Sequence, residues 1–254
     1  FDRMIEISSK ADVPNGTGLG SSGTYLVGLL NALHSLKGEN ISRRQLAEEA
    51  YEITSELGLP DGKQDPYAVS FGNFCAFNIN VDGKVTVENV NVNRKTQERF
   101  EKQTLLFYTG VTRSSEKILK EQHQKIKKGE MKALLLKHKI KKIGQDIRMA
   151  FETGDLDTFG HLMDEHWNLK KSMSEKMSSN FFDEVYKKAK KAGALGGKIL
   201  GAGGGGFFLM YCPEGTEDSV RKVFRKNHMR EVPFRVDSGG TQILVNRPRE
   251  NNTI

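Results

Sequence analysis

The spacing of apolar positions changes along the chain and predicts an irregular mixture of helices and strands. Residues 24–36 and 42–57 repeat apolar positions at the period of a helix, and turn and capping residues bound both segments. Residues 73–92 alternate apolar and polar positions around Asp82 and Gly83, which predicts a β-hairpin. Partial alternation at residues 3–9 and strand-like composition at residues 232–246 predict further strands.

The rest of the chain continues this mixture. Residues 104–112 read as a short buried strand, and residues 155–173 as an amphipathic helix. A glycine-rich stretch then leads into a strand, and residues 213–226 form another helix-like segment. Because hairpins interrupt the alternation of helices and strands, the pattern predicts an α+β fold and not a doubly wound parallel sheet.

The positive charge of the chain is concentrated in one lysine-rich run, which has two interpretations. The chain has 254 residues and a formal net charge of +7, and ten of its lysines lie between Lys117 and Lys142. Clustered cations are typical of nucleic-acid binding. The same run also places apolar residues at helical spacing, which favours a solvated helix with one buried stripe. That stripe is Leu136, Ile140, Ile143 and Ile147.

Cysteine content and the chain's first residue give two further expectations. Cys75 and Cys212 are isolated in apolar stretches, which favours packing as free thiols in a reducing, cytoplasmic compartment. No run approaches the 18 apolar residues of a membrane-spanning helix. Phe1 stands within an expected strand, so we expect this chain to be the downstream part of a longer protein.

The first stretch that carries chemistry is VPNGTGLGSSGT, where Gly18, Gly20 and Gly23 have the spacing G-x-G-x-x-G. A dinucleotide fingerprint would follow its strand directly and belong to a βαβ unit, which this context lacks. A Walker loop would carry lysine where Thr24 stands. The glycines still allow close approach of an anion, and the helix that follows offers free N–H groups at its N-terminus. A structural capping turn, the alternative, needs fewer glycines.

A second glycine-rich loop, residues 201–206, holds five glycines in six positions. Such a loop loses much backbone entropy on folding, so something must approach it closely. A tight packing corner between helix and strand is the alternative. The two loops together favour a nucleotide site.

Both loops resemble those of the GHMP small-molecule kinases. PNGTGLGSSGT is similar to their phosphate loop, and GGKILGAGGGGFFLMY to their C-terminal glycine motif. GKQDPYAVSFGNF, FYTGVTRSS and EHWNLKK resemble the sugar-kinase branch that includes heptose phosphate kinases, with fucokinases nearby. The likeness extends over nearly the whole chain, but the family's N-terminal strand-and-loop motif is absent.

The resemblance implies a set of residues that bind ATP and magnesium. The ATP-binding residues would be Pro14, Gly16, Gly18, Leu19, Gly20, Ser21, Ser22 and Gly23. Ser22 and a glutamate of the preceding helix would bind Mg²⁺; Glu52 is preferred, with Glu56 the alternative. Asp65 matches the catalytic aspartate, and a neighbouring Lys63 would help it to stay ionised. From spacing alone, Asp65 could instead cap the helix that begins near Pro66.

The substrate-binding residues implied by the resemblance are Lys63, Asp65, Arg113, Gly203 and Gly204. An arginine such as Arg113 can bind a substrate phosphate through two parallel hydrogen bonds, although a surface arginine is the alternative. His166 lies on an amphipathic helix and is expected to be a core histidine with its hydrogen bonds satisfied. Lys170 and Lys171 are expected to be solvated.

As a whole, the resemblance implies a two-domain α+β GHMP fold, with a ribosomal-protein-like domain in residues 1–95 and a ferredoxin-like domain in residues 96–254. The implied reaction transfers a phosphoryl group from ATP to the anomeric hydroxyl of D-glycero-D-manno-heptose 7-phosphate. A kinase for an unphosphorylated sugar such as fucose or galactose is the first alternative, and a non-catalytic RNA-binding protein is a remote one. The expected partners are small molecules and not nucleic acid or a membrane, and a homodimer is left open.

Overall fold

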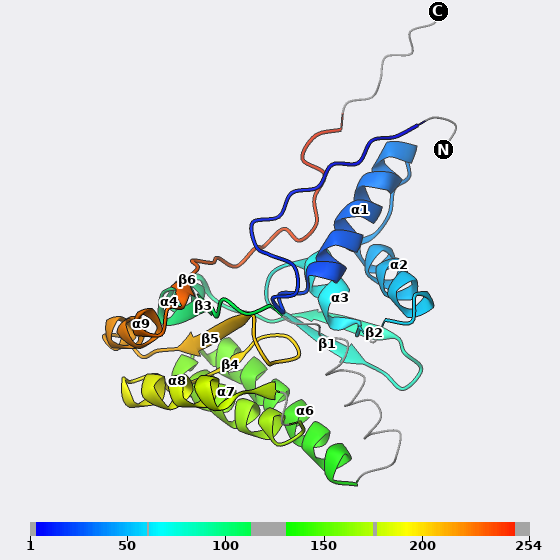
Figure 1. Ribbon diagram of the computed structural model, residues 1–254. Helices are drawn as coiled ribbons and strands as arrows, with labels where there is room; N and C mark the ends of the chain where they lie inside the picture. Colours follow the sequence, from blue (N-terminus) through cyan, green and yellow to red (C-terminus); the bar gives the residue numbers. More distant parts are fainter. Residues whose placement is uncertain (1–3, 60, 113–130, 175–176, 247–254) are drawn as a thin grey trace, which may run out of the picture.

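The computed structural model describes residues 4–59, 61–112, 131–174 and 177–246 (Figure 1). The N-terminal half packs three helices beside a β-hairpin. The C-terminal half packs helices on a four-stranded antiparallel sheet. Helices and strands are mixed without βαβ repeats, so the predicted α+β class is confirmed. A domain boundary near residue 95 stays a prediction.

The N-terminal half follows local sequence signals closely. Its α-helices each begin or end at a residue suited to that position: Gly38 ends the first helix with φ 75°, and Ser42 forms a capping box with Gln45 at the start of the second. The hairpin turns at the predicted Asp82 and Gly83. The elements are α1 (Ser21–Lys37), α2 (Arg43–Glu56), α3 (Gln64–Phe71), β1 (Cys75–Ile79) and β2 (Val85–Asn89).

The C-terminal half is built on a sheet with strand order β4-β5-β3-β6, in which all neighbours are antiparallel. The strands are β3 (Thr104–Tyr108), β4 (Gly196–Ile199), β5 (Phe207–Tyr211) and β6 (Arg230–Glu231). The helices are α4 (Arg94–Gln103), α6 (Met131–Thr153), α7 (Leu156–Lys171), α8 (Asn180–Lys191) and α9 (Glu217–Lys226).

Helix α7 packs unusually close to strand β4 because glycines face each other there. A Cβ atom added to Gly196 would lie 2.0 Å from the carbonyl oxygen of Gly160 and 2.7 Å from the backbone nitrogen of Asp164. Only a residue without a side chain allows this approach. The contact fixes the position of α7 relative to the loop that follows β4.

Aromatic residues join the two halves of the molecule. Phe74, just before β1, contacts Phe151 of α6 and Phe100 of α4, with ring centroids 5.0 and 5.7 Å apart. Phe100 also contacts Phe159 of α7 at 5.7 Å. The edge-to-face and tilted geometries are those that aromatic pairs prefer. The hairpin is therefore anchored in the core of the C-terminal half.

Two predicted strands are wrong. Residues 4–10 and 232–246 carry no strand, although Val232 still donates a backbone hydrogen bond to Leu106. A strand requires a partner to complete its hydrogen bonds, and no ladder to another described strand forms at either segment. Residues 232–246 instead run back from β6 to α1 (Figure 1).

We call residues 232–246 the return segment. Its contacts to the N-terminal half are polar and come from its backbone and short side chains. The Asp237 carbonyl accepts a hydrogen bond from the Asn73 backbone at 2.6 Å. Asn31 of α1 donates to the hydroxyl of Thr241 at 3.2 Å. The return segment thus ties the sheet of one half to the first helix of the other.

The structure also tests the expectations for the lysine-rich helix, the two cysteines and membrane-spanning segments, within the residues that it describes. Ile143 is buried and Leu136, Ile140 and Ile147 are half-buried, while the lysines of α6 that the structure describes are exposed, as expected of a solvated helix. Residues 113–130 of the lysine-rich run lie outside the described residues. Cys75 and Cys212 are both free thiols, as predicted. No described helix is long and apolar enough to cross a membrane.

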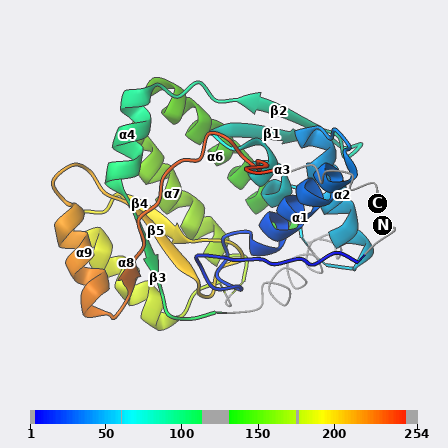
Figure 2. The same cartoon turned by 90° about the horizontal axis from the view of Figure 1, so that it is seen from above.

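The two glycine loops touch through their backbones (Figure 2). A Cβ atom added to Gly206, which has φ 88°, would lie 1.9 Å from the carbonyl oxygen of Thr17, and Thr17 itself is fully buried. Gly206 therefore meets two constraints, a left-handed backbone and a backbone neighbour in direct contact.

Gly206→Ala and Gly215→Ala separate these two constraints, because Gly215 has the same φ of 88° with nothing within 4 Å of an added Cβ. Backbone strain alone predicts that Gly215→Ala lowers the free energy of unfolding by about 1–2 kcal/mol. Gly206→Ala must also displace the Thr17 backbone, which adds roughly 1–3 kcal/mol. Equilibrium urea denaturation measures both, and equal losses would show that the loops do not depend on this contact.

Candidate active site

The first glycine loop presents the start of helix α1. Gly16, Gly18 and Gly20 have φ values of 75°, 81° and 69°, so each adopts a backbone conformation that other residues rarely adopt. The Thr17 hydroxyl donates to the Pro14 carbonyl at 2.9 Å and closes the turn. Gly20 is the N-cap of α1 and has no side chain to bond the first helical N–H groups. These N–H groups and the helix dipole favour an anion at this point.

The second glycine loop is held by backbone hydrogen bonds to two neighbouring segments. Gly204 donates to the Met177 carbonyl at 2.7 Å, and Gly206 donates to the Val111 carbonyl at 2.8 Å. A Cβ on Gly203 would lie 2.8 Å from the Met177 carbonyl oxygen. The loop is thus fixed between Met177 on one side and the first glycine loop on the other. Protein backbone thus approaches the loop closely, as the alternative of a tight packing corner also predicts, and the nucleotide site stays a prediction.

Asp65 lies across the start of α1. A Cβ on Gly20 would be 3.0 Å from the Asp65 Cγ, and a Cβ on Gly23 would be 3.2 Å from the Asp65 Cβ. Helix α3 begins at Gln64 with Lys63 as its N-cap residue, so Asp65 stands inside the first turn. The alternative that Asp65 caps this helix is therefore wrong. Its carboxylate instead faces the place where the first loop favours an anion.

Lys63 does not pair with Asp65. The Lys63 ammonium donates to Glu48 at 2.6 Å and to the Gly83 carbonyl at 2.8 Å, and it lies 4.9 Å from the Tyr51 ring centroid. The expectation that Lys63 keeps Asp65 ionised is thus not met. Lys63 ties α2, α3 and the hairpin turn together.

The environment of Asp65 favours its protonated form. Partial burial of the carboxyl, and then the nearby charge of Asp61, raise the pKa of Asp65 above its ordinary value. Both causes penalise the charged form. A raised pKa brings a carboxylate closer to the range in which it exchanges protons near neutral pH, which suits a general base.

Asp61 is a residue that the sequence reasoning missed. The Ser22 hydroxyl donates to an Asp61 carboxylate oxygen at 3.1 Å, across 39 positions of sequence. The only signal was a second aspartate four residues before Asp65 in the stretch DGKQD. Ser22 and Asp61 place hard oxygen atoms beside the first glycine loop, and such atoms are typical ligands of Mg²⁺.

The predicted magnesium ligand Glu52 is exposed on α2, as is the alternative Glu56. The contact that the structure gives to Ser22 comes from Asp61, not from either glutamate. Within the described ranges, no group of three or more His, Cys, Asp or Glu side chains is arranged to hold a metal ion. Mg²⁺ is usually bound through one or two protein oxygens together with substrate phosphates, and the Ser22 and Asp61 oxygens are of the kind that it takes.

The remaining predicted residues have mixed outcomes. Arg113 lies outside the described residues. His166 is not a satisfied core histidine, because its Nδ1 atom is buried with no hydrogen-bond partner among the residues described. Lys170 donates to the Gly201 carbonyl, and Lys171 bonds Asp183 at 3.2 Å, so neither is simply solvated.

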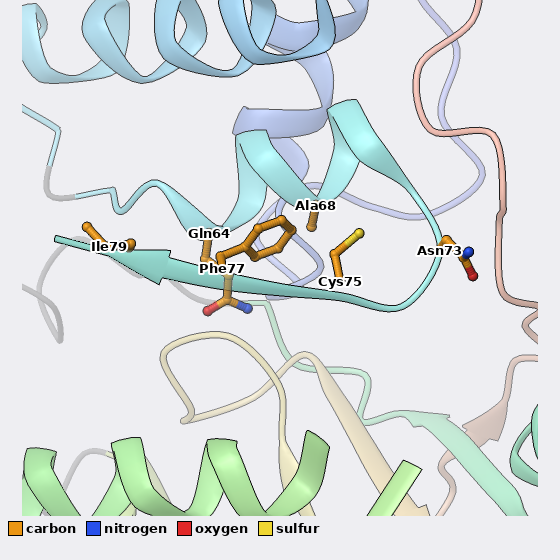
Figure 3. Close-up of a pocket in the computed structure, with 6 residues that line it drawn as sticks. All are labelled: Gln64, Ala68, Asn73, Cys75, Phe77 and Ile79. Atoms are coloured by element: carbon orange, nitrogen blue, oxygen red, sulfur yellow. The ribbon is translucent and has the colours of Figure 1, made fainter. Parts of the chain in front are cut away.

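A cavity of about 470 Å³ lies between α3 and β1 (Figure 3). Its lining is mixed, with Cys75 and Phe77 of β1 facing Ala68 of α3. Gln64, the neighbour of Asp65, also lines it, but none of the predicted site residues does. The predicted chemistry therefore gathers at the start of α1 and not in this cavity.

Two family models match this chain and together cover more than half of it. Residues 2–73 match the GHMP kinases N terminal domain, which contains the first glycine loop and Asp65. Residues 147–230 match the GHMP kinases C terminal model, which contains the second glycine loop.

Individual relatives agree with these models. A D-glycero-alpha-D-manno-heptose 7-phosphate kinase of Campylobacter jejuni is 33% identical over 223 residues, covering 87% of this chain and 65% of that protein. The structure of a D-glycero-D-manno-heptose 1-phosphate kinase from Bacteroides thetaiotaomicron superposes with a TM-score of 0.71 at 28% identity, covering 93% of this chain and 66% of that one. An L-fucokinase/L-fucose-1-P guanylyltransferase of Bacteroides fragilis is 24% identical over 230 residues, covering 89% of this chain and 24% of that protein.

The chain thus spans just under two thirds of the length of the two heptose kinases that it matches. Within that span, both glycine loops and Asp65 occur in matched segments, and the fold has the mixed α+β architecture expected from the sequence. The chain belongs to the GHMP kinase family.

Proposed function

We propose that this protein transfers the γ-phosphoryl group of ATP to a sugar hydroxyl, namely the anomeric hydroxyl of D-glycero-D-manno-heptose 7-phosphate. The observation that carries the proposal is the meeting of three features at one point: the start of α1, the second glycine loop and the Asp65 carboxylate. Phosphoryl transfer needs a cradle for phosphates and a group that positions the attacking hydroxyl. The named activities of the Campylobacter and Bacteroides relatives support a heptose phosphate as the acceptor.

In this proposal, the first glycine loop binds the phosphates of ATP. The backbone N–H groups at the start of α1 point toward the anion. The positions with positive φ are glycines, which have no side chain to block its approach. Binding involves the whole predicted set: Pro14, Gly16, Gly18, Leu19, Gly20, Ser21, Ser22 and Gly23. Ser22 would hold Mg²⁺ with Asp61 or Glu52. When bound, the ion would neutralise charge on the transferred group.

Asp65 is the proposed general base. Its carboxylate lies beside the first loop, so a hydroxyl bonded to it would stand next to the terminal phosphate of ATP. Removing the hydroxyl proton as the oxygen attacks phosphorus makes that oxygen a better nucleophile. Gly203 and Gly204 would border the sugar from the other half of the molecule, and Lys63 would fix α3 behind it.

The proposed acceptor carries its own phosphate, and Arg113 would contact it. A kinase for fucose, galactose or another unphosphorylated sugar is the alternative, since every nucleotide-side residue would serve it equally. A panel of heptose 7-phosphate, fucose, galactose and mannose with ATP and magnesium, using the full-length protein, decides between them by ADP release. A cytoplasmic location would suit this reaction and the two free thiols.

Asp65→Asn tests the general base. It removes the basic oxygen while keeping the size of the side chain, so kcat should fall by about 10²–10⁴-fold with little change in the melting temperature. Asp82→Asn is the matched control, because Asp82 lies in the exposed hairpin turn, where asparagine before glycine is equally suited. Full activity in Asp65→Asn would remove Asp65 from the mechanism.

The pH dependence of kcat/KM tests the environment of Asp65. The base must be deprotonated, and burial and Asp61 raise its pKa, so activity should fall on acidification at a higher pH than an ordinary aspartate would give. Asp61→Asn removes the repulsive charge, so the loss of activity on acidification, the acid limb of the profile, should move to lower pH. An acid limb that stays in place in Asp61→Asn would contradict the assignment.

A further inference from the structure

Glu48 of α2 binds the two residues that stand two positions before and two positions after Asp65. One carboxylate oxygen of Glu48 accepts a hydrogen bond from the Lys63 ammonium at 2.6 Å. The other oxygen accepts a hydrogen bond from the Tyr67 hydroxyl. The carboxylate therefore connects both ends of the first turn of α3, and we call Glu48, Lys63 and Tyr67 the Glu48 bridge.

The bridge binds the side of α3 that faces away from Asp65. Lys63 and Tyr67 are four residues apart, and the Tyr67 backbone N–H donates to the Lys63 carbonyl at 3.2 Å, so their side chains share one side of the turn. A helix rotates by about 100° per residue, which puts Asp65 on the opposite side. There Asp65 faces Gly20 and Gly23 at the start of α1. The first turn of α3 thus lies between the Glu48 carboxylate and the first glycine loop.

The position of the Asp65 carboxylate depends on the backbone of this turn. Among the residues that the structure describes, none donates a hydrogen bond to the Asp65 side chain. Helix α3 has only eight residues, and its N-cap residue, Lys63, makes no side-chain capping bond. Helices this short are not stable on their own. Contacts with other elements must therefore order the turn.

The bridge extends these contacts to the hairpin. Lys63 also donates to the Gly83 carbonyl at 2.8 Å, in the turn between β1 and β2. The Tyr67 ring is fully buried, and its centroid lies 5.8 Å from that of Phe77 on β1, edge to face. Glu48 thus fixes α3 to two neighbours at once, α2 and the hairpin.

The protonation states suit the bridge. Burial opposes ionisation of Glu48, but the hydrogen bonds from Lys63 and Tyr67 outweigh it and hold the pKa of Glu48 below its usual value. Burial, and then the bond to Glu48, raise the pKa of Tyr67 to about 12, so its hydroxyl stays protonated at neutral pH. A carboxylate between two donors makes charge-assisted hydrogen bonds, which are stronger than neutral ones.

We propose that Glu48 is a positioning residue for phosphoryl transfer, because it fixes the first turn of α3 and so keeps the Asp65 carboxylate at the start of α1. This inference rests on the proposed function, since it takes Asp65 as the general base. It goes beyond that function by making the rate depend on a residue of α2 whose carboxylate is already engaged by Lys63 and Tyr67. A displacement of about 1 Å of a reacting group can cost roughly 100-fold in rate.

Glu48→Gln in the full-length protein tests the proposal through kcat, measured with and without the Asp65 carboxylate. The amide keeps the size of the side chain, but its single oxygen can accept from Lys63 or Tyr67 and not from both through separate atoms. With Asp65 present, we expect kcat to fall by about 10- to 100-fold and the KM for ATP to change less than about twofold. In Asp65→Asn, the same substitution should lower the residual kcat by less than about twofold, because no base is left to misplace.

Glu49→Gln is the matched control, because Glu49 is the next residue of α2 and its carboxylate bonds His34 of α1 at 2.8 Å. It should change kcat by less than about twofold. An equal fall of kcat in Glu48→Gln with and without the Asp65 carboxylate would overturn the proposal, because a residue needed only for folding affects both proteins alike. Unchanged kcat in Glu48→Gln would also overturn it.

Amide hydrogen exchange gives a second readout that needs no substrate. In Glu48→Gln, the segment 63–71 should exchange about 10- to 100-fold faster, while the segment of α1 around the buried Val27 and Leu30 keeps its rate. Exchange that stays unchanged, or rises equally in both segments, would contradict the proposal. If Glu48→Gln does not fold, Tyr67→Phe provides the same comparisons, since it removes one hydroxyl and leaves the buried ring in place.

The two proposals fail in different ways. If the wild-type protein phosphorylates no sugar, the proposed function fails, and hydrogen exchange still decides whether Glu48 fixes the first turn of α3. If the wild type is active, Asp65→Asn is impaired and Glu48→Gln keeps its full kcat, the proposed function stands and the role of Glu48 is overturned.

Discussion

The close contact between the backbones of the two glycine loops is the constraint on which the rest of the site depends. Thr17 and Gly206 meet at a distance that excludes any side chain, and they join segments nearly two hundred residues apart. Gly20 and Gly23 in turn leave the room that Asp65 occupies. Hydrogen bonds from Gly204 and Gly206 fix the second loop to Met177 and Val111, so Gly206 is held in place where it meets Thr17. Rigid placement of this kind is what positions reacting groups in an enzyme.

Charge is distributed asymmetrically around this contact. Asp61 and Asp65 lie on the N-terminal side, where the charge of Asp61 helps to raise the pKa of Asp65 and Asp61 accepts a hydrogen bond from the Ser22 hydroxyl. Lys170 lies on the C-terminal side, where it donates to the Gly201 carbonyl at the base of the second loop. Carboxylates therefore lie beside the first glycine loop and an ammonium group beside the second.

The fold was predictable where local signals decide it, and the failures came where distant partners do. Ser42 with Gln45 marks a helix start, Gly38 marks a helix end, and Asp82 with Gly83 marks a turn, all from neighbouring residues. Residues 4–10 and 232–246 have strand-like patterns, but a strand exists only if another segment completes its hydrogen bonds. Pattern alone does not contain that information.

The same distinction applies to the site. The phosphate loop and Asp65 could be recognised from the sequence because each lies in a short continuous motif, PNGTGLGSSGT and GKQDPY. The partner of Ser22 was not, because Asp61 reaches it across 39 positions of chain. Lys63 was expected beside Asp65 for its place in the sequence, yet its four-carbon side chain extends to Glu48 instead. His166 was expected to be satisfied, and only the packing of α7 on β4 shows that it lacks a partner.

The return segment has a consequence for how the molecule denatures. It joins β6 to α1 through Asp237, Thr241 and neighbouring residues, while Phe234 packs against the same Phe100 ring that contacts Phe74. Melting of either half would therefore strip polar and aromatic contacts from the other. Two bodies linked in this way lose their structure as one cooperative unit, so calorimetric and van't Hoff enthalpies should coincide for the chain as a whole.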